Sequence, residues 1–193
     1  MERATSLARR EGADVCDRSR RTVLNWAGAT LAGAAAFGFD PRSLRLTEAT
    51  AKNGVVDLGT GDIALLNYAY ALEQLEAAFY TAVMASPYSG MTRCERSVLS
   101  DVKGHEIAHR EFFRKALGSS RNPELEITLP SVDFGDRGSV LRTASMFEDL
   151  GVSAYNGAGA LLTGAEHVAA VGTLVSVEAR HAAILRDLLS PDS

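Results

Sequence analysis

The chain has 193 residues, of which 46% are hydrophobic, and its 20 basic and 24 acidic side chains give a formal net charge of −4. This length and composition fit one globular domain with a core of its own, and the mild negative charge gives no reason to expect nucleic-acid binding. Two cysteines are too few for an iron centre built from paired Cys-x-x-Cys motifs.

The first 36 residues are predicted to be a signal peptide rather than part of the fold. Arg20 and Arg21 stand directly before an apolar stretch at 23–36, an order that resembles a twin-arginine export signal. That stretch is rich in Ala and Gly and is interrupted by Asn25, so no stable membrane span is expected. We therefore expect the export machinery as a partner, a periplasmic or other extracytoplasmic location, and a polar linker at 37–59.

The remaining chain, 60–190, has the apolar periodicity of long amphipathic helices. The predicted helices cover 62–85, 92–117, 139–162 and 165–189. Short loops join the first helix to the second and the third to the fourth, whereas 118–138 is long enough to run the length of a bundle. We predict an all-α, antiparallel four-helix bundle with one long crossover between helices 2 and 3. Residues 125–129 in this crossover alternate like a strand and are interpreted as an extended strap.

The second and fourth predicted helices each carry the pattern Glu-x-x-His, as Glu106 with His109 and Glu178 with His181. Three residues along a helix place two side chains about 60° apart, so each pair can point at one spot. A single such pair is usually a solvated pair on a helix surface. Two of them, converging from two helices, offer the mixed oxygen and nitrogen ligands of iron and manganese sites.

The motifs belong to a duplicated pattern. The second Glu-x-x-His follows the first by 72 positions, and upstream Glu73 and Tyr80 are matched by Glu148 and Tyr155 at an offset of 75. The chain is therefore interpreted as two helical hairpins of one type. The glutamates all lie on the apolar stripe of their helices, where an unpaired carboxylate is costly, so their convergence indicates compensation by a cation.

These residues resemble the ferritin-like di-metal carboxylate superfamily, whose site takes one Glu from each of two helices and Glu-x-x-His from each of the other two. Within it, the run Leu-Glu-Gln-Leu-Glu-Ala-Ala-Phe-Tyr at 72–80 resembles the first helix of exported ferritin-like domain proteins. The resemblance implies two metal ions, iron with manganese as the alternative, and places Tyr80 and Tyr155 beside the ligands. The implied ligands are Glu73, Glu106, His109, Glu148, Glu178 and His181.

Glu76 competes with Glu73 for the ligand position in the first helix. The spacing to the Glu-x-x-His motif favours Glu76, because 106 − 76 and 178 − 148 are both 30. The tyrosine seven positions on and the flanking leucines favour Glu73, since a change in loop length leaves these local features intact. We interpret Glu73 as the ligand, and Glu76 as an extra ligand or a buried acid beside the ligands. His105 and His167 lack an acid at the right spacing and are interpreted as surface or bundle-end residues.

The resemblance implies an exported di-metal, most simply di-iron, protein that reacts with oxygen or peroxide. Its expected chemistry is Fe(II) oxidation or peroxide reduction, as in an oxidoreductase of the ferroxidase or peroxidase type. Two alternatives stay open: a subunit of an iron-storage cage, and a structural or stress-protection protein whose metal stabilises the bundle. The expected partners are metal ions, oxygen or peroxide and the export machinery, and a homodimer is compatible with the sequence.

Overall fold

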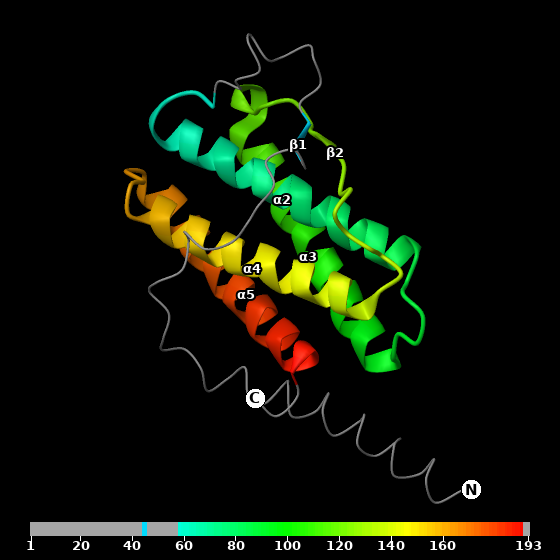
Figure 1. Cartoon of the computed structure of the whole chain (residues 1–193). Helices are drawn as coiled ribbons and strands as arrows, with labels where there is room; N and C mark the ends of the chain where they lie inside the picture. Colours follow the sequence, from blue (N-terminus) through cyan, green and yellow to red (C-terminus); the bar gives the residue numbers. More distant parts are fainter. Residues whose placement is uncertain (1–43, 46–57, 191–193) are drawn as a thin grey trace, which may run out of the picture.

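The computed structural model of the protein describes residues 44–45 and 58–190. The predicted signal peptide and nearly all of the predicted linker lie outside the described residues. Four long helices form an antiparallel bundle (Figure 1), which confirms the all-α prediction. They are α2 (Gly61–Ala85), α3 (Arg93–Leu117), α4 (Arg137–Gly159) and α5 (Ala165–Leu189).

The bundle consists of two hairpins, α2 with α3 and α4 with α5, which pack together through α2 against α4 and α3 against α5. At one end, Glu95 in the first turn of α3 accepts a hydrogen bond from Arg137 Nε at 2.5 Å. The same guanidinium donates to the carbonyl of Leu188, in the last turn of α5, at 2.7 Å. Because the starts of α3 and α4 meet at this end, the two helices run parallel, as a long crossover between them requires.

Local capping explains where the helices begin and end. Thr92 and Glu95 form a reciprocal capping box at the start of α3. Asp136 caps α4 by accepting from the Ser139 backbone N–H at 2.6 Å, so α4 begins two residues before the predicted start. It also ends earlier than predicted, at Gly159, because the N–H groups of the next residues turn back to the Ala158 carbonyl.

At the opposite end of the bundle, Asp62 in the first turn of α2 joins the two hairpins. Its carboxylate accepts the backbone N–H groups of Thr163 at 3.0 Å and Gly164 at 2.8 Å, in the loop between α4 and α5. His167 Nδ1 lies 2.7 Å from the same carboxylate. His167 is thus a bundle-end residue, the position expected for it.

The crossover contains a short 3-10 helix, η2 (Gly118–Ser120), and a two-residue strand, β2 (Glu126–Ile127). The strand pairs antiparallel with β1 (Leu44–Arg45), with Leu44 opposite Ile127. The predicted strap is therefore partly a strand, because a segment of the predicted linker supplies the pairing partner that the sequence did not reveal. Gln74 of α2 fixes the crossover to the bundle by accepting from the Leu125 N–H at 2.8 Å.

The apolar core is divided into two clusters along the bundle axis. One cluster includes Phe79, Leu99, Leu141 and Leu185, and the other includes Tyr70, Phe113, Tyr155 and Leu174. Every helix contributes to both clusters, and in every helix a buried glutamate lies between the two contributions. The fold thus encloses a polar layer between two apolar layers, where water is excluded from both sides.

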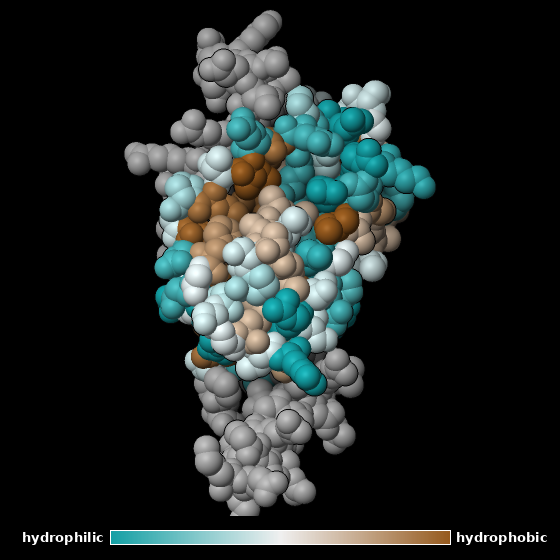
Figure 2. All heavy atoms as spheres, turned by 90° about the vertical axis from the view of Figure 1, so that its right-hand side faces the viewer, coloured by the Kyte–Doolittle hydropathy of each residue, from teal (hydrophilic) through white to brown (hydrophobic). Residues whose placement is uncertain are grey.

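The outer surface mixes polar and apolar side chains, and the face in Figure 2 shows an apolar patch bordered by hydrophilic residues. Among the described residues, α5 is long and apolar enough to cross a membrane by length and composition alone. The core helix of a bundle has the same composition, and α5 carries buried Glu178 and His181 within this one. The expectation that the protein has no membrane span stays a prediction.

Candidate metal centre

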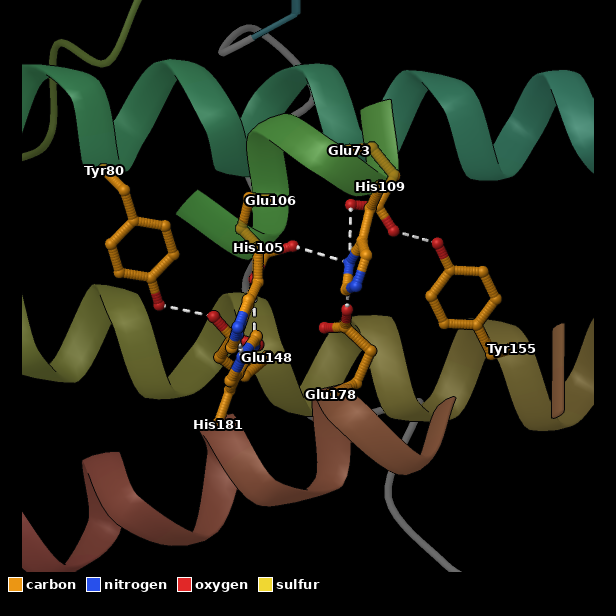
Figure 3. Close-up of polar contacts among 9 residues, drawn as sticks. All are labelled: Glu73, Tyr80, His105, Glu106, His109, Glu148, Tyr155, Glu178 and His181. Atoms are coloured by element: carbon orange, nitrogen blue, oxygen red, sulfur yellow. Dashed lines mark hydrogen bonds and ion pairs between the residues drawn. The ribbon is translucent and has the colours of Figure 1, made fainter. Parts of the chain in front are cut away.

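The polar layer contains five glutamates and two histidines that the four helices bring to the middle of the bundle. Figure 3 shows all of them except Glu76. The side chains of Glu73, Glu106, Glu148 and Glu178 are 0% exposed. Glu76, His109 and His181 retain between 2% and 7% of their surface. Burial of this many carboxylates in an apolar bundle requires compensating positive charge.

One group of candidate ligands surrounds His109 of α3. Its Nδ1 lies 3.4 Å from Glu73 Oε2, 3.1 Å from Glu106 Oε2 and 3.0 Å from Glu178 Oε1. These four residues each direct one ligand atom into a space where all the atoms lie within 4.8 Å of one another. The arrangement has three oxygen donors and one nitrogen donor, a set suited to iron or manganese.

A second group surrounds His181 of α5. Its Nδ1 lies 2.8 Å from Glu106 Oε1 and 3.1 Å from Glu148 Oε2. Glu178 completes this group, again with ligand atoms within 4.8 Å of one another. Glu106 and Glu178 therefore belong to both groups, one oxygen of Glu106 facing each histidine. The geometry therefore offers two adjacent candidate cation positions that share two carboxylates.

Several carboxylate oxygens of the two groups have no hydrogen-bond partner in the part of the chain that the structure describes and are therefore available to metal ions. Glu106 Oε1 and Glu178 Oε1 approach histidine nitrogens at 2.8 and 3.0 Å but lack hydrogen-bond geometry. Glu178 Oε2 and Glu73 Oε2 likewise have no hydrogen bond within the described part of the chain. Buried carboxylate oxygens are normally satisfied, so this cluster of unsatisfied oxygens marks a place for cations.

Without metal, the two imidazoles carry the compensating charge. Burial alone would lower the pKa of His109, but its hydrogen bond with Glu106 and the close carboxylates of Glu178 and Glu73 raise it to about 12. His181 is likewise held protonated by Glu106 and Glu148, with a pKa of about 10. Burial raises the pKa of Glu73 to about 8, whereas the close contacts of both protonated histidines outweigh burial and hold the pKa of Glu106 at about 2. Metal ions would replace these protons, because a ligating imidazole must be neutral.

Two tyrosines close the ends of the layer. Tyr80 of α2 donates to Glu148 Oε1 at 2.5 Å, and Tyr155 of α4 donates to Glu73 Oε1. Each tyrosine reaches across from one hairpin to the glutamate of the other, and the two pairs lie at opposite ends of the cluster (Figure 3). Each hydrogen bond occupies one carboxylate oxygen and leaves the other, Oε2, directed at a histidine. The predicted position of both tyrosines beside the cluster agrees with this arrangement.

Glu76 lies in the same buried layer but belongs to neither group of candidate ligands. Its Oε2 has no hydrogen-bond partner among the described residues. Burial and the charges of the neighbouring glutamates raise its pKa well above the usual value, which favours the protonated form. The geometry therefore favours Glu73 over Glu76 as the candidate ligand from α2.

His105 contacts His181, which the sequence did not indicate. It is exposed, as expected, but its Nδ1 lies 2.8 Å from Nε2 of His181, and the two rings stack with centroids 5.1 Å apart. Because His181 turns its Nδ1 toward the glutamates, its other nitrogen is free to donate to His105. No helical spacing distinguishes His105 from a surface histidine, since its partner lies on another helix 76 positions away.

A four-helix bundle that brings Glu and Glu-x-x-His side chains from both hairpins into one buried layer defines a ferritin-like protein. Residues 61–191 match the Ferritin-like domain family, and the chain belongs to this family. No curated protein sequence matches the chain. The family match covers all four helices and therefore every residue of the polar layer.

Proposed function

We propose that the chain is a di-metal redox protein whose ions are iron and whose oxidant is oxygen or hydrogen peroxide. The observation that carries the proposal is the pair of ligand groups sharing Glu106 and Glu178. Shared carboxylates hold two ions close together, which is how a two-metal site acts on one small molecule. The six candidate ligands are Glu73, Glu106, His109, Glu148, Glu178 and His181.

Two iron ions bound there would supply the electrons that reduce oxygen or peroxide. The chain's own part is to hold the ligands in place before the ions arrive. Tyr80 and Tyr155 fix the orientation of Glu148 and Glu73, and partners of this kind tune reactivity as well as affinity. The apolar clusters on both sides of the layer exclude water, which strengthens the charge interactions within it.

Export by the twin-arginine pathway is the second part of the proposal. It rests on Arg20 and Arg21 before the apolar stretch of the first 36 residues. The twin-arginine pathway transports folded proteins, so a centre loaded with metal in the cytoplasm would reach the extracytoplasmic space intact.

Iron storage is the alternative function. Every candidate ligand comes from one chain, so the centre itself does not require a neighbouring subunit. A storage function additionally requires a hollow assembly of many subunits. Native mass spectrometry of the purified protein separates the alternatives, since a cage of many copies supports storage and a monomer or dimer supports the redox enzyme.

The proposal is tested by metal analysis and by reaction with peroxide. The exported form should contain about two iron ions per chain after anaerobic loading, because six ligands exceed what one ion takes from a protein while keeping positions open. The ferrous protein should then consume peroxide with a change in its near-ultraviolet absorbance. Protein that retains neither iron nor manganese contradicts the proposed centre. Protein that retains iron but leaves peroxide unchanged supports the metal-stabilised structural role instead.

A further inference from the structure

A pocket of about 250 Å³ opens between α3 and α5, outside the polar layer. Its walls are apolar and branched: Val98 and Val102 from α3, and Val177 and Ile184 from α5. Drug-sized ligands occupy pockets of about 300 to 1,000 Å³, so this pocket has room for a molecule of roughly one ring. Branched aliphatic walls on two sides favour a flat apolar body between them.

The polar groups of the pocket are Asp101, Arg180 and the two stacked histidines, His105 and His181. Asp101 and Arg180 bring opposite charges, and His181 is neutral when it ligates a metal ion, so the pocket of the metal-loaded protein has no net charge to attract an ion. A carboxylate, a guanidinium and an imidazole together offer both acceptors and donors of hydrogen bonds. These features favour an uncharged molecule that carries hydroxyl groups.

The pocket reaches the polar layer through one side chain. His181 lines the pocket and at the same time directs its Nδ1 at Glu106 and Glu148. The ring of His105 stacks on that of His181 at the pocket side, and the ring of His109 lies beyond it with centroids 6.3 Å apart (Figure 3). A molecule in the pocket is therefore separated from the candidate metal positions by one imidazole.

The two halves of the duplicated pattern differ at the positions that line this pocket. At the offset of 72 that relates the two Glu-x-x-His motifs, His105 corresponds to Val177 and Arg180 corresponds to Ala108. The position on α5 that corresponds to His105 in the repeat thus has an aliphatic side chain instead of an imidazole. His105 and Arg180 therefore depart from the repeat, whereas His181 follows it.

We propose that this pocket binds an uncharged single-ring hydroquinone, which supplies electrons to the metal centre through His181. The inference rests on the proposed function, since reduction of peroxide to water consumes two electrons that a reductant must provide. The hydroquinone loses two electrons and its two O–H protons to become a quinone. The electrons reduce two ferric ions to ferrous ions, and the protons pass to solvent beside exposed Asp101. With peroxide as the final oxidant, the net products are one quinone and two waters.

Binding is tested first, on protein loaded with redox-inactive zinc and with phenol as the probe. Methyl NMR should show saturable shifts confined to the four apolar wall residues. Val177→Phe fills the pocket and should remove these shifts, whereas the same substitution at exposed Val168, also on α5 but outside the pocket, should leave them. Ile184→Trp is a second filling variant for the case that Val177→Phe does not fold.

Electron supply is tested on the diferric protein by anaerobic stopped-flow absorbance. Reduction by para-hydroquinone is compared with reduction by dithionite, a small inorganic reductant that does not depend on the pocket. The ratio of the two rates should fall at least about tenfold in Val177→Phe and in Ile184→Trp, a typical loss when a pocket no longer fits its ligand. It should stay unchanged in Val168→Phe. Division by the dithionite rate removes any general damage to the centre.

Each outcome has a separate meaning. An equal ratio in filled and unfilled variants overturns the inference, because the reductant then reaches the centre elsewhere. Absence of phenol shifts in the zinc protein overturns it as well, while leaving a peroxide-reactive iron centre untouched. Phenol binding in a protein whose iron does not react with hydroquinone or peroxide rejects the electron-supply role together with the proposed function.

Discussion

Gly151 of α4 lies directly opposite Glu76 of α2 across the polar layer. A methyl group at Gly151 would come within 3.4 Å of Glu76 Oε1 and within 2.9 Å of Glu178 Oε2. The two positions are equivalent in the duplicated pattern, because 151 − 76 equals the offset of 75 that relates Glu73 to Glu148. One half of the repeat therefore has a fifth carboxylate, Glu76. The other half has a glycine at the equivalent position, and the absence of a side chain there leaves room for this carboxylate.

Gly151→Ala should destabilise the bundle and weaken metal binding. The new methyl group must displace the carboxylate of Glu178, which belongs to both candidate ligand groups and is held in a packed interior. We expect a loss of at least about 1 kcal/mol in the free energy of unfolding, the usual cost of overpacking. The measurement is urea unfolding of the metal-free and zinc-loaded proteins.

Gly157→Ala is the matched control, since it lies on the same helix with nothing within 4 Å of the added methyl group. It should stabilise the protein by about 0.5 to 1 kcal/mol, because alanine loses less conformational freedom in a helix than glycine does. Equal effects at the two positions would show that Glu178 is not confined by Gly151.

Glu73→Ala and Glu76→Ala should differ in metal content. Glu73 directs Oε2 at His109 and belongs to a candidate ligand group, so its removal should strongly lower metal occupancy. Glu76 belongs to neither group, and its removal should leave most of the metal bound and alter reactivity. Elemental analysis after identical anaerobic loading compares the two. Loss of metal in Glu76→Ala with retention in Glu73→Ala reverses the assignment and supports the spacing of 30.

Tyr80→Phe and Tyr155→Phe should each lower metal affinity by about 10- to 100-fold while leaving the fold intact. Each removes one buried hydrogen bond to a glutamate, from Glu148 or Glu73, without creating a cavity. Competition for zinc with a chromogenic chelator measures the change. The circular dichroism spectrum is the control for folding, and affinities equal to that of the parent protein would show that the tyrosines do not orient the ligands.

Much of this architecture is visible in the sequence because its signals are local. The apolar stripes predict the four helices. The Glu-x-x-His spacing and the two offsets of the duplicated pattern predict which side chains meet in one layer. The length of the crossover predicts that α3 and α4 run parallel. The hydrogen bond between Arg137 and Glu95, at the starts of these two helices, agrees with this prediction.

The features that the sequence does not reveal depend on contacts between distant segments. The pairing of β2 with β1 requires a partner about 80 positions away, and a two-residue strand has no periodicity of its own. His105 reaches His181 only because α3 and α5 pack side by side. The choice between Glu73 and Glu76 also depends on side-chain direction, since both lie on the inward face of α2.

Arg20→Lys combined with Arg21→Lys should leave the precursor in the cytoplasm. The twin-arginine pathway distinguishes the two guanidinium groups from ammonium groups, so the conservative change keeps the charge and removes the signal. A reporter fused to residues 1–45 measures export of the parent and double-lysine sequences in the same cells. Equal export of the two fusions contradicts the assignment of the leader.

The metal-free protein should be less stable at pH 9 than at pH 6. The folded-state pKa of His181 is about 10, above its ordinary value of 6.5, so its contribution to stability is complete below pH 6.5 and is lost as the pH rises through 10. Glu73 acts in the same direction, because its pKa rises from 4.5 to about 8 and folding favours its protonated form. Glu106, with a pKa of about 2, loses its contribution only in strong acid and does not oppose this trend.

The measurement is the urea midpoint of the protein at pH 6 and pH 9 in the presence of a chelator, where we expect a loss of at least about 1 kcal/mol at the higher pH. The zinc-loaded protein is the control and should show the opposite trend, because its ligands bind metal only after losing their protons. A chelated protein that becomes more stable between pH 6 and pH 9 would mean that His181 and Glu73 are not held protonated by the folded structure. The difference between the two forms isolates the polar layer, since every other titrating group is common to both.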